Sequence, residues 1–193
     1  MFTHTPTRAL AALALMGSLA LTACSSGEPS DGDEQELITQ VTLTLTPDGG
    51  GAPLTVRADF ESDGTNPTFT PASLALTPGT SYTGTIELRD TFNNGDITEE
   101  IEGEAEEHLF RYAFAPPAAA TVTITDKESD YTSENANGGD YAVGLRFRVV
   151  VSPTASGTGT MNAVLYHFDE APKTSSTATS DEIDVDVTFP VRF

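Results

Sequence analysis

The residues best suited to chemistry form an acidic segment that runs from Asp96 to Leu109. Seven of its first twelve residues are Asp or Glu, and a histidine follows them. Apolar residues recur in it at every fourth position, which predicts a short amphipathic helix capped by Asn93, Asn94 or Asp96. On such a helix four side chains of metal-ligand type lie close enough to share one cation, namely Glu100, Glu104, Glu107 and His108.

These carboxylates repel one another if the helix forms. Like charges recur three and four positions apart, at about 0.2–0.5 kcal/mol per pair before screening, and Gly103 weakens the helix further. A divalent cation, a basic partner surface or high salt would offset the repulsion. Oxygen ligands favour Ca²⁺ or Mg²⁺, whereas the histidine admits a transition metal. The alternative, which the acidic composition of the whole chain favours, is a solvated face.

A second group of acids alternates in a polar loop farther along the chain. Asp126, Glu128 and Asp130 have the spacing that opens a calcium loop. An EF-hand needs Gly at the sixth position and Glu at the twelfth, but this sequence has Tyr131 and Asn137 there. The EF-hand is therefore excluded, and a looser cation loop of a β-sandwich is the alternative to a plain surface loop.

Constellations typical of catalysis are absent from the sequence. No Ser or Cys stands with a His and an acid at the spacing of a triad, and no glycine-rich phosphate loop occurs. We interpret His108, at a helix-to-strand junction, and His167, in an apolar strand, as capping or packing residues. We therefore predict that the chain is not an enzyme.

Composition limits the partners. The 193 residues include 29 Asp and Glu against 9 Lys and Arg, which gives a net charge of -20. Nucleic-acid binding needs a basic stripe that displaces phosphate counterions, so no nucleic-acid partner is expected. One Cys and three His leave little material for disulfides or a Cys-rich zinc site. Adaptation to high salt is another origin of such a surface.

The N-terminal residues are typical of an export signal. Arg8 precedes an apolar run, too short to span a bilayer, that ends in Leu21-Thr22-Ala23-Cys24. This ending resembles the lipobox of bacterial lipoproteins, which implies a signal peptide over residues 1–23 and a lipid on Cys24. Residues 24–36 are predicted to be a disordered acidic tether, because residues 25–36 offer no apolar side chain to bury.

Residues 37–193 have the pattern of a single β-sandwich domain, long enough for one core. Apolar and polar residues alternate in runs of strand length, separated by turns rich in Gly, Pro and Thr. The clearest runs are Val41–Leu45, Leu54–Phe60, Tyr82–Leu88, Tyr141–Val151 and Ile183–Phe193. In the last run Ile183 alternates with Asp184, so we expect the carboxylate to face solvent. The expected architecture is an antiparallel sandwich of immunoglobulin-like outline with one short acidic helix.

Three details of this sandwich follow from local sequence. Leu74–Leu76 and Tyr82–Leu88 flank a Pro-Gly turn that predicts a hairpin. Thr160–Phe168 is apolar on both faces, which predicts a central strand or a strand covered on its outer side. Pro190 cannot donate a ladder hydrogen bond, so it places the last strand at an edge or a bulge.

Several stretches together resemble a group of small lipoproteins of the Bacteroidota and related bacteria. They are residues 37–45, 83–88, 96–101, 106–110 and 184–191, and the resemblance covers nearly the whole mature chain. Such proteins are often encoded beside TonB-dependent outer-membrane receptors, which implies an accessory role at a transporter.

A serine directly after Cys24 also fits sorting to the outer membrane, on either its periplasmic or its cell-surface side. We therefore expect a non-enzymatic outer-membrane lipoprotein that binds a ligand or partners such a receptor. A cation-binding or structural surface module of an acidic, halophilic envelope is the alternative, with a divalent cation such as calcium as its ligand.

Overall fold

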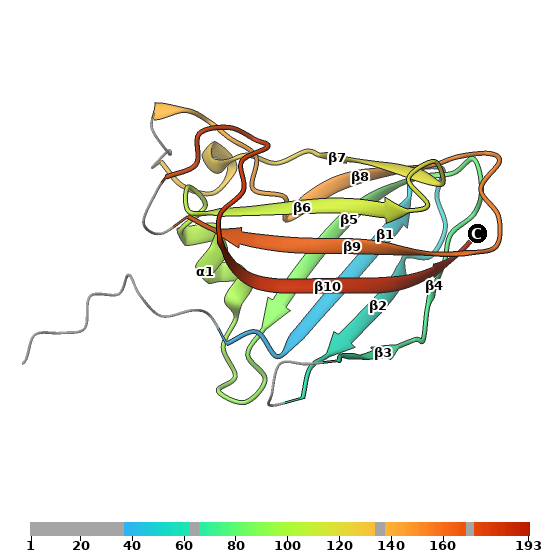
Figure 1. The fold of residues 1–193 in the computed structure, drawn as a ribbon, viewed down its shortest axis with the longest axis horizontal. Helices are drawn as coiled ribbons and strands as arrows, with labels where there is room; N and C mark the ends of the chain where they lie inside the picture. The colour runs from blue at the N-terminus through green and yellow to red at the C-terminus, as the bar shows by residue number, and fades with distance from the viewer. Residues whose placement is uncertain (1–36, 62–65, 134–137, 169–171) are drawn as a thin grey trace, which may run out of the picture. The chain divides into compact units, whose positions relative to one another are not determined.

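The computed structural model describes residues 37–61, 66–133, 138–168 and 172–193 (Figure 1). The predicted signal peptide, Cys24 and the tether lie outside these ranges. Among the described residues, no helix combines the length and the apolar character needed to cross a membrane.

Two β-sheets face each other and form a sandwich (Figure 1). The larger sheet has the order β3 (Thr68–Thr70), β2 (Leu54–Asp59), β1 (Gln40–Pro47), β5 (Ser81–Arg89), β8 (Arg146–Val151), β7 (Ala120–Ile124). The smaller sheet has the order β4 (Leu74–Ala75), β10 (Glu182–Arg192), β9 (Thr158–His167), β6 (His108–Ala115). The predicted β-sandwich is confirmed, and its immunoglobulin-like outline stays a prediction.

Alternation along the strands builds the core between the sheets. In β1 every second side chain is fully buried, as the sequence pattern requires. Val187 and Phe189 of β10 occupy the facing layer in the same manner. The predicted central strand is confirmed, because β9 lies between β10 and β6. The edge or bulge predicted from Pro190 is wrong, because β10 lies between β4 and β9 and its bulge is between Ile183 and Val185. The proline is tolerated because the short β4 pairs with Val191 and Arg192 and stops before Pro190.

The hairpin predicted across the Pro-Gly turn is wrong. The turn itself forms, since the Thr80 amide donates to the Thr77 carbonyl at 3.1 Å. However, β4 pairs in parallel with β10 in the smaller sheet, whereas β5 belongs to the larger sheet. Leu74 and Leu76 are both buried, so this short segment fills the core while the turn carries the chain from one sheet to the other.

The strand predicted from Tyr141 to Val151 begins only at Arg146. Gly144 has a φ of +96°, in the left-handed region that interrupts a strand. The amides of Gly144 and Arg146 donate to the carboxylate of Asp126 instead of to a neighbouring strand. In this part of the chain, hydrogen bonds from the backbone to the Asp126 side chain therefore take the place of hydrogen bonds between strands.

Gly84 gives a test of the packing between β5 and β8. A Cβ at this position would overlap the ring of Phe147, its cross-strand partner, which is fully buried. We predict that Gly84→Ala lowers the free energy of unfolding by about 1–3 kcal/mol, measured by urea denaturation. Gly49→Ala, where a Cβ meets nothing within 4 Å, is the matched control. Equal unfolding midpoints for the two variants would contradict this packing.

Candidate metal centre

The acidic segment folds into a shorter helix than its sequence predicts. Helix α1 (Ile97–Gly103) ends at the glycine, and β6 begins at His108 after a turn. Ile97 and Ile101 bury the apolar face, but Glu104 has already left helical geometry, with ψ at 38°. The predicted last helical turn at Glu106 and Glu107 is therefore wrong, because Gly103 has low helix propensity and further acids would follow it.

The predicted cap is also only partly right. Asp96 occupies the N-cap position, but its side chain makes no capping hydrogen bond. Its carboxylate instead accepts from the guanidinium of Arg89 at 3.1 Å.

The shorter helix disperses the first predicted cation set. Glu100 and Glu104 are exposed, Glu107 is half-buried, and His108 is fully buried. Within the described ranges, one group of three or more His, Cys, Asp or Glu side chains brings its ligand atoms within 4.8 Å of one another, and His108 is the sole member of the predicted set in it.

The second predicted set, in the loop after β7, does not converge either. Asp126 accepts hydrogen bonds from two backbone amides and from the hydroxyl of Tyr131. Glu128, in the 3₁₀ helix η1 (Glu128–Asp130), turns into the core, whereas Asp130 stays exposed and accepts from the Lys127 amide. Each acid contacts different protein groups, so the three carboxylates do not come together here, and the cation loop stays a prediction.

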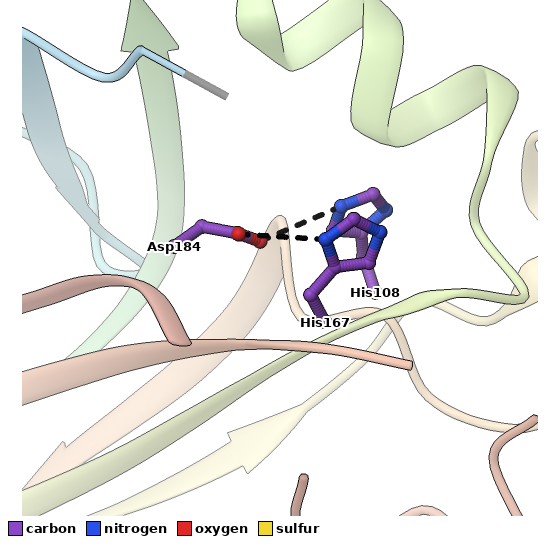
Figure 2. A group of neighbouring side chains, drawn as sticks. All are labelled: His108, His167 and Asp184. Atoms are coloured by element: carbon purple, nitrogen blue, oxygen red, sulfur yellow. Dashed lines mark ion pairs between the residues drawn. The ribbon is translucent and has the colours of Figure 1, made fainter. Parts of the chain in front are cut away.

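The group that does converge consists of His108, His167 and Asp184 (Figure 2). His108 begins β6 and His167 ends β9, and the two residues are directly opposite in the antiparallel ladder. Their rings stack with centroids 4.5 Å apart and 20° between the ring planes. Figure 2 shows both rings beside the carboxylate of Asp184, which comes from β10.

A β-bulge turns Asp184 inward. The register between β10 and β9 shifts between Ile183 and Val185, so Asp184 is the extra residue. Its side chain is 1% exposed, whereas Ile183 is 39% exposed. This is the reverse of the simple alternation that the sequence predicts, and bulges characteristically re-aim side chains in this way.

The distances in the group exceed those of ordinary hydrogen bonds. His108 Nε2 lies 3.6 Å from Asp184 Oδ2, and His167 Nδ1 lies 3.5 Å from Asp184 Oδ1. Hydrogen bonds of this kind span about 2.7–3.2 Å. Ligand atoms about 2.05 Å from a tetrahedral zinc ion are about 3.3 Å apart. The two histidine–carboxylate separations are therefore close to those of atoms that share a metal, and all three ligand atoms lie within 4.8 Å of one another.

The remaining ring nitrogens face acceptors. His108 Nδ1 lies 3.1 Å from the carbonyl oxygen of Glu104, and a carbonyl can only accept, so Nδ1 carries the proton. In the neutral ring the lone pair is then on Nε2, the nitrogen beside Asp184. His167 Nε2 lies 3.9 Å from the carboxylate of Glu107. Metal-bound histidines are oriented by such carbonyl and carboxylate partners.

Negative charge surrounds the group. Burial raises the pKa of Glu107, and the carboxylates of Glu104 and Glu106 raise that pKa further, against the effect of the two histidines. A divalent cation beside Asp184 would reduce this repulsion.

A buried lysine holds the turn that carries His108. The ammonium of Lys173 donates to the carbonyls of Ala105 at 2.6 Å, His108 at 2.8 Å and Ala142 at 3.1 Å, and lies 3.0 Å from Glu128 Oε1. Both charged side chains are completely buried. Burial lowers the pKa of Lys173, and the carboxylate of Glu128 opposes that shift. Sequence reasoning missed Lys173, a lone charge in a stretch rich in Ser and Thr.

Comparison with protein-family models, curated proteins and solved structures found no match for this chain.

The buried ion pair gives a stability prediction. Lys173→Met leaves Glu128 buried without its cation, so we expect it to cost about 3–5 kcal/mol of unfolding free energy in urea denaturation. The double variant Lys173→Met/Glu128→Gln removes both charges and should recover a large part of the loss. Lys127→Met, which breaks an exposed pair with Asp140, should change little. A similar loss in both lysine variants would contradict the role given to burial.

Proposed function

We propose that this chain is a non-enzymatic binding module whose ligand is a divalent transition-metal ion held by His108, His167 and Asp184. The observation that carries the proposal is the convergence of two imidazoles and one buried carboxylate from three strands, with one ligand atom of each within 4.8 Å of the others. Rigid strands position such a set better than loops do.

The ligand types favour zinc or a similar ion over calcium. Calcium takes six to eight oxygen ligands, whereas this group offers two nitrogens and one carboxylate. Three protein ligands also leave a fourth tetrahedral position for water or another ligand. His167, which is 13% exposed, provides the side nearest to solvent.

Metal binding requires a small rearrangement. The two rings are only 20° from parallel, so their lone pairs do not meet at one point without rotation of a ring. His167 has more room to turn than the fully buried His108. The carboxylate of Glu107 would then accept a hydrogen bond from its Nε2 and hold the new orientation.

The cellular setting comes from sequence resemblance. A lipid on Cys24 would hold this domain at the outer membrane, where a TonB-dependent receptor is the partner that the resemblance implies. A metal-binding domain on such a tether suits an accessory role in transport across that membrane.

Metal titration tests the proposal. We expect one Zn²⁺ per chain in calorimetric titration, a saturable rise in the unfolding midpoint, and visible absorption typical of tetrahedral coordination with Co²⁺. His167→Gln and Asp184→Asn should abolish these signals. Glu107→Gln should weaken binding about 10–100-fold, because it removes only the outer partner.

Glu100→Gln is the control, since it removes an exposed carboxylate of the dispersed set. It should bind Zn²⁺ as tightly as the unmodified protein. Stabilisation that follows ionic strength alone, equal effects of Ca²⁺ and Zn²⁺, or undiminished binding by His167→Gln would contradict the proposal.

A further inference from the structure

A cleft of about 510 Å³ lies at the side of the sandwich where β6 and β7, the edge strands of the two sheets, lie next to each other. Loops near Lys127, Ala142 and Ser176 complete its walls. Its volume is in the range of small-molecule sites. None of the three residues of the metal centre lines it.

One wall of the cleft is apolar and fixed. Tyr112, Val122 and Ile124 contribute side chains from the two edge strands. The hydroxyl of Tyr112 donates to the Gly144 carbonyl at 2.6 Å, and its ring packs on Phe147 with centroids 4.4 Å apart. The aromatic ring is therefore held in place before any ligand arrives.

The cleft also contains an unusual cation. The chain has nine Lys and Arg residues, and all except Arg8 lie in the described ranges. Six of these eight lie within 4.0 Å of a carboxylate. The two exceptions are Arg192, which donates to the hydroxyl of Ser73, and Arg111. Arg111 lines the cleft and donates through Nη1 to the carbonyl oxygen of Thr177 at 2.7 Å. A carbonyl orients the guanidinium without neutralising it.

The other ionisable side chains of the cleft already have partners in the protein. Lys127 and Asp140 form an ion pair at 2.6 Å. Asp126 is 2% exposed, and its oxygens accept from two backbone amides and the hydroxyl of Tyr131. Among the described residues, Arg111 is therefore the cation of the cleft that has no carboxylate partner, although the chain is strongly acidic overall.

We propose that this cleft binds a small organic carboxylate. The guanidinium has five donors, and those not used on Thr177 can hold a carboxylate in a bidentate pair. The hydrocarbon part of the ligand lies against Tyr112, Val122 and Ile124. The proposal needs both halves of the cleft, so an inorganic anion or a neutral apolar molecule alone is a poor ligand.

Three probes with the same hydrocarbon chain test this chemistry: hexanoate, hexanol and hexylamine. Metal is first removed with a chelator, and the chelator is then dialysed away so that its own carboxylates do not compete. Each probe is titrated into this ¹⁵N-labelled protein and followed by backbone amide resonances. We expect hexanoate to shift the resonances of residues 122–127 and 176–177 saturably. Hexanol, hexylamine and inorganic phosphate should bind at least tenfold more weakly.

Arg111→Gln should weaken hexanoate binding at least tenfold. Arg192→Gln, which removes the other arginine that lacks a carboxylate partner, is the matched control and should leave binding unchanged. The absence of hexanoate shifts, equal binding of hexanol or phosphate, or undiminished binding by Arg111→Gln would overturn the proposal. Because these outcomes do not involve zinc, they are independent of the metal centre.

Discussion

Charge buried at one end of the sandwich is the constraint on which the rest of the structure depends. Lys173, Glu128, Asp126 and Asp184 all lie out of solvent around the junction of α1 and β6. Removing a charge from water is costly unless a partner and hydrogen bonds compensate it. The irregular features of this end, which are the broken strand at Gly144, the turn after Gly103 and the bulge in β10, accompany that compensation.

The buried acids are compensated in different ways. Glu128 faces the buried ammonium of Lys173, whose remaining donors go to backbone carbonyls. Asp126 accepts from backbone amides and a tyrosine. Asp184 faces two imidazole rings. Positive charge beside Asp184 therefore comes either from protonation of the rings or from a metal ion that they share with the carboxylate. The metal proposal therefore concerns the one acid of the three whose partners can also be metal ligands.

The sequence predicts much of the regular structure but little of the site. Alternation in β1 and β10 and the two-sided apolar pattern of β9 identify strands correctly, because burial on one or both faces determines the side-chain types. The sheet to which β4 belongs is not predictable in this way. A Pro-Gly turn specifies that the chain reverses direction, but it does not specify which sheet the flanking strands join. The bulge at Asp184 is equally hidden, because it changes the register without a distinctive residue. His108 is identified as a candidate ligand from sequence, but for a helix that stops five residues earlier.

The most direct test of the central claim is anomalous diffraction at the zinc absorption edge from crystals grown with Zn²⁺. We expect one peak per chain, within bonding distance of His108 Nε2, His167 Nδ1 and the carboxylate of Asp184. A peak at the exposed acids of α1, or no peak at the group while the protein is intact, would contradict it.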